Sequence, residues 1–234
     1  MSLIRKVTCK LSHIYYERLS IKRHAVGKVL MLHWVDDNAK ESEISPYHIS
    51  TEGCRKLLKW LNGQNTIRLE NWEQEKDFYA LSIDDVPENF YHNVYPLLKE
   101  MEIPFTIFVN TTLLDGRGYI TVDQLKEIAR CPLCTVGSHG VSHSLYYKMS
   151  ANEALKDLQK SKKILETIID CPVEMYAFPY GSYYACGYQN KFLVMKVYKY
   201  GFGTIGAPIT FPNTLPNYYL PRINVDCEFI KNIK

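Results

Sequence analysis

The sequence predicts an α/β protein, a (β/α) barrel with about seven parallel strands. From about residue 27 onward, short runs rich in β-branched and aromatic residues alternate with helical patterns. This alternation is typical of βα units around a parallel sheet or barrel. The predicted strands are 29–33, 78–83, 105–109, 135–137, 175–178, 202–205 and 219–225.

Helix start signals lie between these strands. Ser150-Ala151-Asn152-Glu153 has the pattern of a capping box and predicts a long helix through Ile169, and Thr121 begins a similar pattern for a shorter helix. Residues 1–26 show no clear period and are expected to form an N-terminal extension. Residues 36–47 are polar and contain a Ser-Pro turn, which predicts a long loop after the first strand.

Size and composition favour one soluble globular domain over residues 1–234. Of these residues, 46% are hydrophobic and 23% are charged, which is sufficient for a substantial core. The net charge is only +3 and basic residues are scattered among acids, so no nucleic-acid partner is expected. The longest strongly apolar stretch, 29–35, is too short to cross a bilayer. Because there is no signal-peptide pattern and the seven cysteines are irregularly spaced, we expect a cytoplasmic protein.

Side chains suited to catalysis occur just past the carboxyl ends of predicted strands. In a parallel barrel all these ends open on one face, where the active sites of such barrels lie. Residues that are distant in sequence are therefore expected to converge there. They are His33, Asp84 and Asp85, His139 and His143, and Pro179 and Tyr180.

Asp85, His139 and His143 form a candidate ligand set for zinc or a similar divalent ion. Two imidazoles and one carboxylate leave positions for water and substrate, which suits a catalytic metal. The histidines are four residues apart, so one helical turn or a tight loop can direct both at one point, although chance pairs share this spacing. With Asp85 on the metal, Asp84 is free to take a proton from the activated water. Alternatively, both aspartates cap the following helix.

Three motifs, taken in order, resemble the polysaccharide deacetylase superfamily, also called the NodB-homology domain. Ser82-Ile83-Asp84-Asp85-Val86 resembles its T-F-D-D-G motif, and His139-Gly140-Val141-Ser142-His143 resembles its H-x-x-x-H motif. Phe178-Pro179-Tyr180-Gly181 is similar to its aromatic-Pro-Tyr segment. The resemblance covers about residues 27–225, and three ordered motifs are more specific than any one. It implies a distorted barrel of fewer than eight βα units.

The resemblance also implies a metal-dependent hydrolase that removes an N-acetyl group from a sugar in an oligo- or polysaccharide or a glycan precursor. Asp84 would be the general base, and the three candidate ligands would hold a divalent metal, Zn²⁺ first, with Co²⁺, Ni²⁺ or Fe²⁺ as alternatives. The backbone N–H of Tyr180, which follows Pro179, would stabilise the oxyanion. The oligomeric state and the particular saccharide are left open.

Family members usually carry a general-acid histidine in a late motif, whereas no histidine follows His143 in this chain. The circularly permuted branch of the family, which includes deacetylases of biofilm poly-N-acetylglucosamine, carries this histidine before the Asp-Asp motif. The segment that ends at His33 is similar to that displaced strand. The resemblance therefore assigns His33 as the acid that protonates the departing amine, and the alternative is a satisfied core histidine.

The motifs also depart from the family pattern. Val86 replaces a glycine, and because a β-branched residue tolerates positive φ poorly, the turn after Asp85 is expected to avoid a glycine conformation. Ala177 stands where the family has an arginine. Arg222 is the candidate to orient Asp84 in its place, with a surface position as the alternative.

Aromatic side chains near these motifs are candidates for stacking against sugar rings. Trp34 lies beside His33, and Tyr180 begins a tyrosine-rich segment, although a chain with 18 tyrosines shows such crowding by composition alone. Three other functions remain open. They are a deformylase or amidohydrolase acting on a different amide, a non-catalytic carbohydrate-binding or scaffold protein on the same barrel, and an iron oxygenase with a two-His, one-carboxylate site.

Overall fold

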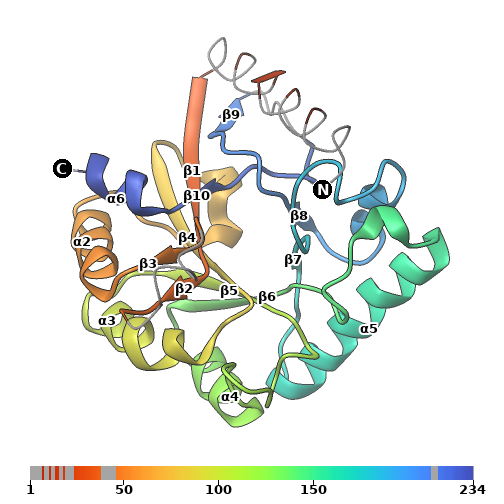
Figure 1. The fold of residues 1–234 in the computed structure, drawn as a ribbon, viewed down its shortest axis with the longest axis horizontal. Helices are drawn as coiled ribbons and strands as arrows, with labels where there is room; N and C mark the ends of the chain where they lie inside the picture. Colours follow the sequence, from red (N-terminus) through yellow and green to blue (C-terminus); the bar gives the residue numbers. More distant parts are fainter. Residues whose placement is uncertain are drawn as a thin grey trace.

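A curled parallel sheet surrounded by helices forms the centre of the molecule (Figure 1). The computed structural model describes residues 24–37, 46–211 and 216–233, together with Val7, Leu11, Ile14, Tyr15 and Arg18. The main sheet runs in the order β10-β1-β4-β5-β6-β7-β8, and β9 pairs with β1. The strands are β1 (His24–Leu32), β4 (Phe78–Asp84), β5 (Phe105–Val109), β6 (Cys134–Ser138), β7 (Met175–Ala177), β8 (Tyr200–Phe202), β9 (Ile209–Phe211) and β10 (Ile223–Asn224).

Every neighbouring pair in this seven-strand path is parallel. The segment just before β10 also bonds to β8 at the other end of the path, because Leu220 N–H donates to Gly201 O and Gly203 N–H donates to Leu220 O. The same stretch of chain thus connects both edges of the sheet. The predicted distorted (β/α) barrel with about seven parallel strands is confirmed.

Helices cover the outside of the sheet, and two of them begin as expected. Ser150 and Glu153 form the predicted capping box of α5, and Thr121 forms the equivalent box of α4. The α-helices are α2 (Thr51–Asn62), α3 (Tyr95–Glu100), α4 (Val122–Ala129), α5 (Ala151–Ile169) and α6 (Cys227–Asn232). Shorter helical turns are η2 (Leu69–Gln74), η3 (Phe90–Val94), η4 (Tyr146–Lys148) and η5 (Asn190–Lys196). Within the described part of the chain, no helix has the length and apolar character needed to cross a membrane.

The first and last predicted strands differ from the observed ones. β1 begins at His24, five residues before the predicted start, and its first residues pair with β9. Residues 24–26 therefore belong to the sheet and not to an N-terminal extension. Only residues 223–224 of the last predicted strand are β10, because the residues before them cross to β8. The predicted loop 36–47 contains residues 38–45, which lie outside the described residues; on either side of them, β2 (Trp34–Val35) pairs with β3 (His48–Ile49).

Alternation along the strands separates two apolar layers. Val29 and Ala80 belong to a cluster inside the barrel, whereas their neighbours Leu30 and Leu81 belong to the larger cluster that includes the helices. Successive side chains of a strand point to opposite faces. Every second residue of β1 and β4 therefore faces the interior, up to the carboxyl ends of the strands.

Candidate active site

Four of the predicted site residues continue this interior-facing alternation. His33 follows β1, Asp84 ends β4, His139 follows β6 and Arg222 directly precedes β10. Each stands an even number of residues from an interior position of its own strand or segment, so all four side chains enter the same end of the barrel. The fold therefore brings His33, Asp84 and His139 together, as the strand-end argument predicted, and adds Arg222, which was proposed separately as the residue that orients Asp84.

Asp85, His139 and His143 form a compact three-residue cluster. Asp85 Oδ1 lies 3.8 Å from His139 Nε2 and 3.6 Å from His143 Nε2. One ligand atom from each residue lies within 4.8 Å of the others. These separations are too long for hydrogen bonds. The two imidazoles and the carboxylate thus face a common point without bonding to one another.

The donor atoms of this cluster fit a divalent cation. His139 Nδ1 donates a hydrogen bond to the carbonyl oxygen of Ala177 at 2.8 Å, which leaves the lone pair on Nε2. Asp85 Oδ1 is buried and has no hydrogen-bond partner among the described residues. A buried carboxylate oxygen without a partner is costly unless a cation compensates it. Nitrogen and carboxylate ligands in this number suit zinc and related transition metals.

Asp84 is held by a buried ion pair with Arg222. Arg222 Nη1 lies 2.6 Å from Asp84 Oδ1, and Nη2 lies 2.8 Å from Oδ2. The guanidinium also donates to Gly203 O and to Ser82 Oγ. Because Arg222 is 0% exposed, the alternative that it lies on the surface is wrong. Ser82, which replaces the threonine of the family motif, therefore supports this arginine.

The charge state of Asp84 follows from these contacts. Burial alone would raise the pKa of its carboxyl group, but the charge of Arg222, assisted by His139 and His33, holds the pKa well below its usual range. Asp84 is therefore ionised at neutral pH. Each of its two oxygens accepts one hydrogen bond from Arg222 and has a lone pair left for a further hydrogen bond, since a carboxylate oxygen can accept more than one.

His33 lies beside Asp84, with its Nε2 atom 3.8 Å from Asp84 Oδ2. Its Nδ1 atom is buried and has no hydrogen-bond partner in the described part of the chain, and its ring packs against Tyr47 with centroids 4.7 Å apart. A satisfied core histidine would have partners for its buried nitrogens, so this alternative is wrong. Burial lowers the pKa of His33, and the nearby carboxylates of Asp84 and Asp85 act in the opposite direction.

Several site residues have an unusual backbone conformation. Asp85, Val86, His143 and Tyr180 have φ values of 60°, 51°, 45° and 61°. The expectation that Val86 avoids a glycine conformation is therefore wrong. Its side chain is fully buried, its N–H donates to Asp84 O at 2.7 Å, and its carbonyl accepts from Ile120. These contacts hold a conformation that a valine alone would not adopt.

Asp157 of α5 supports the histidine loop and was not singled out from the sequence. Its carboxylate accepts hydrogen bonds from the backbone N–H groups of Val141 and Ser142, from the Ser142 hydroxyl and from the Tyr146 hydroxyl. Gly140 has φ of 82°, and a Cβ there would lie 2.9 Å from Asp157 Oδ2. The motif glycine is thus required by this close approach.

A sequence signal for Asp157 existed. The buried face of α5 includes Ala154, Leu158 and Ser161. Asp157 lies three residues after Ala154 and four before Ser161, which places a carboxylate on an otherwise small or apolar helix face.

The remaining predicted residues lie at the rim. Tyr180 is 53% exposed, its ring is 4.8 Å from that of His143, and its backbone N–H makes no hydrogen bond within the described residues. Pro179, before it, is buried. Trp34 stacks on His48 and contacts Tyr119. In the described regions, Trp34 makes no direct contact with the metal cluster. Its neighbour Tyr119 interacts with the cluster, because burial and the charge of Asp85 raise the pKa of the Tyr119 hydroxyl.

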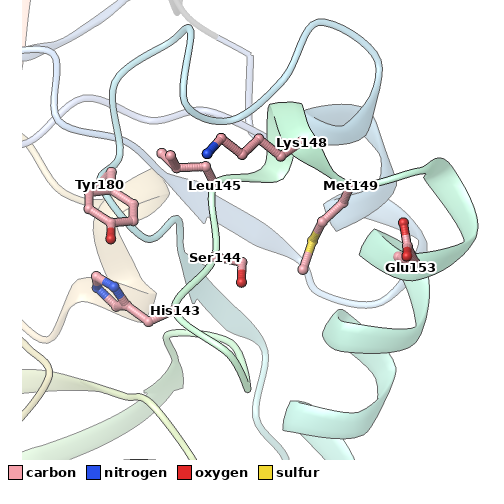
Figure 2. A pocket seen from close by; sticks show the side chains of 7 residues that line it. All are labelled: His143, Ser144, Leu145, Lys148, Met149, Glu153 and Tyr180. Atoms are coloured by element: carbon pink, nitrogen blue, oxygen red, sulfur yellow. The ribbon is translucent and has the colours of Figure 1, made fainter. Parts of the chain in front are cut away.

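A pocket of about 460 Å³ adjoins the cluster (Figure 2). His143 and Tyr180 lie side by side at one end, and Met149 and Glu153 lie at the other. We call it the histidine pocket. Its remaining lining residues are Ser144, Leu145 and Lys148.

Comparison with known families agrees with this geometry. A family model described as polysaccharide deacetylase matches residues 72–191, just over half of the chain. The chain therefore belongs to the polysaccharide deacetylase family, whose members are hydrolases of the amide C–N bond. The predicted resemblance is confirmed. The matched region contains both aspartates and both histidines of the site, whereas His33 and Arg222 lie outside it.

Individual relatives extend over nearly the whole chain. The poly-beta-1,6-N-acetyl-D-glucosamine N-deacetylase of Staphylococcus aureus (strain MSSA476) is 27% identical, with 96% of this chain and 84% of the relative covered. The protein of the same name from Staphylococcus epidermidis is 25% identical with the same coverage.

Solved structures share the fold. The deacetylase PplD of Streptococcus pyogenes has a TM-score of 0.78 at 20% identity, covering 90% of this chain and 98% of that one. IcaB from Ammonifex degensii has a TM-score of 0.73 at 20% identity, covering 90% and 96%.

Proposed function

We propose that this protein is a zinc-dependent N-deacetylase that acts on poly-β-1,6-N-acetylglucosamine or on a saccharide with the same acetamido sugar. The observation that carries the proposal is the buried, unpartnered Asp85 oxygen facing the Nε2 atoms of two histidines. The names of the staphylococcal relatives support the substrate. The assignments to a single domain over residues 1–234 and to the cytoplasm stay predictions from the sequence.

Asp85, His139 and His143 would hold the metal. When bound, a divalent cation there supplies Lewis acidity, which makes water more acidic and stabilises negative charge on an acyl oxygen. The hydrogen bond from His139 to Ala177 O fixes the ring orientation and the tautomer that this requires.

Asp84 would accept the proton of the attacking water. Arg222 fixes both of its oxygens and keeps it ionised, but also lowers its proton affinity. Asp84 is thus a weak base with a well-defined position. It can serve only where the acidity of water is raised, which explains why the base lies next to the metal ligand Asp85.

His33 would donate a proton to the departing amine. An amine is a poor leaving group unless it is protonated. Burial lowers the pKa of His33, so its protonated form is a stronger acid than an exposed imidazolium. The backbone N–H of Tyr180, which has no other partner in the described chain, would stabilise the oxyanion.

Acetate release tests this function. The protein loaded with Zn²⁺ is incubated with β-1,6-linked N-acetylglucosamine oligomers and, for comparison, with β-1,4-linked oligomers of the same length. We expect release from the β-1,6-linked oligomers, lost on chelation and restored by metal, and at least 10³-fold slower in Asp84→Asn, since the base and its charge are removed together. Metal binding without release from any N-acetylated sugar would contradict the proposal and leave a carbohydrate-binding role.

A further inference from the structure

A second pocket, of about 600 Å³, adjoins the histidine pocket. Met149 lines both cavities, so the second one is within reach of a saccharide of several units that is bound at the metal cluster. We call this cavity the tyrosine pocket. Besides Met149 and the first residues of α5, its wall includes Tyr147, Tyr183, Tyr184, Tyr188 and Lys191.

Lys191 brings an unpaired positive charge to this pocket. The residue is 1% exposed, and its Nζ lies 4.0 Å from the ring centroid of Tyr183 and 5.0 Å from that of Tyr188. Among the described residues, Nζ makes no ion pair or hydrogen bond, and its neighbours are these two rings and that of Phe192, whose centroid lies 5.3 Å away. Buried lysines are almost always paired. Burial accordingly lowers the pKa of Lys191, and the Cys186 thiol acts in the opposite direction.

The start of α5 contributes to the same wall. Ser150, the N-cap, and Ala151, the first helical residue, both line the tyrosine pocket. The first N–H groups of a helix have no intrahelical partner, and the N-terminus of a helix 19 residues long attracts anions. The capping box of α5 already uses the N–H groups of Ser150 and Glu153, and the Glu153 carboxylate places a negative charge there. The ammonium of Lys191 is therefore the feature that favours an anion in this cavity.

Aromatic faces supply the rest of the lining. The rings of Tyr147 and Tyr184 are 4.8 Å apart, and Tyr188 is 83% exposed. Such side chains offer an apolar face and a hydroxyl to a sugar ring. A neutral sugar would need these rings but not a buried cation.

We propose that the tyrosine pocket binds a sugar unit that carries a carboxylate or a phosphate, with the anionic group directed at Lys191. This assignment rests on the proposed function, because the pocket would be a subsite for a glycan whose acetamido group lies at the metal cluster. Of the substrates proposed above, it favours a saccharide that combines the acetamido sugar with an anionic unit over the uncharged poly-β-1,6-N-acetylglucosamine. A consequence is that a unit with a free, protonated amine is excluded from this pocket, because its charge would meet that of Lys191.

Calorimetric titration of the full-length, zinc-loaded protein tests the proposal. The probes are glucuronic acid, glucose 6-phosphate, inorganic phosphate and, as the neutral sugar, methyl β-glucoside. Lys191→Met keeps the length of the side chain and removes its charge, and Lys196→Met removes an exposed charge from the same helical turn, η5. We expect both anionic sugars to bind the wild type, about tenfold or more weakly in Lys191→Met and unchanged in Lys196→Met. Urea unfolding verifies that both variants are folded.

Methyl-labelled methionine locates the binding by NMR. The Met149 signal is expected to shift with the anionic sugars, whereas that of Met195, on the exposed side of η5, is not. Three results would overturn the proposal. They are no binding of either anionic sugar, equal binding of methyl β-glucoside, and equal binding of inorganic phosphate and glucose 6-phosphate. Because binding is measured without turnover, an inactive enzyme that binds anionic sugars would refute the proposed function alone.

Discussion

Asp84 and Asp85 are neighbours in the sequence but lie in opposite environments. Asp84 is paired at both oxygens with Arg222, so the protein itself completes its charge balance. Asp85 leaves one buried oxygen unpartnered, and its backbone φ is positive. The difference indicates which half of the site the chain finishes on folding and which half needs a ligand from solution.

The largest effect is expected on the Asp84 side. Arg222→Met leaves the buried carboxylate of Asp84 uncompensated, so we expect the free energy of unfolding to fall by about 3–5 kcal/mol. Urea denaturation measures this loss. Combining Arg222→Met with Asp84→Asn is expected to regain part of it, since no buried charge then remains. As a control, Lys126→Met removes an exposed partner of Asp123 and should change little. A loss as small as that of the control would refute the compensation argument.

The Asp85 side is expected to respond to metal. Zinc at 100 to 1,000 times its dissociation constant is expected to stabilise the wild type by about 3–4 kcal/mol. His143→Ala is expected to abolish most of this gain while leaving the metal-free protein as stable as the wild type, because His143 is only partly buried. Thermal unfolding with and without zinc provides the measurement. An equal zinc-induced shift in both proteins would show that the ion binds elsewhere.

A smaller effect is expected from the loop support. Asp157→Asn keeps the shape of the side chain, but it weakens the hydrogen bonds from Val141 and Ser142 and removes the charge that receives them. We expect zinc affinity to fall about 10- to 100-fold, as for other residues that orient metal ligands. Competition with a zinc chelator measures this. Asp123→Asn, at an exposed position of α4, is the matched control; if both variants bound zinc as the wild type does, the loop would not depend on Asp157.

The smallest effect concerns Val86. In ordinary helices and strands, glycine is less stable than alanine by about 0.5–1 kcal/mol. At φ of 51° the order should reverse, so Val86→Gly is expected to be more stable than Val86→Ala by about 1 kcal/mol, although both lose the buried valine contacts. Urea denaturation of the two variants measures the difference between their free energies of unfolding. Alanine as the more stable residue would mean that the turn can relax away from the left-handed conformation.

Strand alternation and motif order were sufficient to predict the barrel and most of the site. His33 and Asp84 could be anticipated because each stands at a strand end, where period-two alternation decides the direction of the side chain. Arg222 was anticipated differently, as a replacement for the arginine that the family motif has at the position of Ala177. The metal cluster followed from residue type and spacing. Trp34 was chosen only for being next to His33, and adjacent residues of an extended chain point to opposite sides.

Other features depended on contacts between distant segments. The positive φ of Val86 is held by Ile120, and the carboxylate of Asp157 meets a loop that begins 18 residues before it. Lys191 is buried by tyrosines that the sequence shows only as an enriched residue type. Local sequence patterns do not indicate such contacts, because the contacts form only when helices and strands pack against one another.

The segment that closes the barrel carries Arg222, and this arrangement has a consequence for synthesis. Ribosomes synthesise a protein from its N-terminus to its C-terminus, so β4 and Asp84 leave the ribosome before residues 216–225 do. Until residues 216–225 are made, Asp84 must either stay hydrated or take up a proton, and the bonds from Leu220 to β8 are absent. A nascent chain therefore cannot complete the ion pair between Asp84 and Arg222 before residues 216–225 are made.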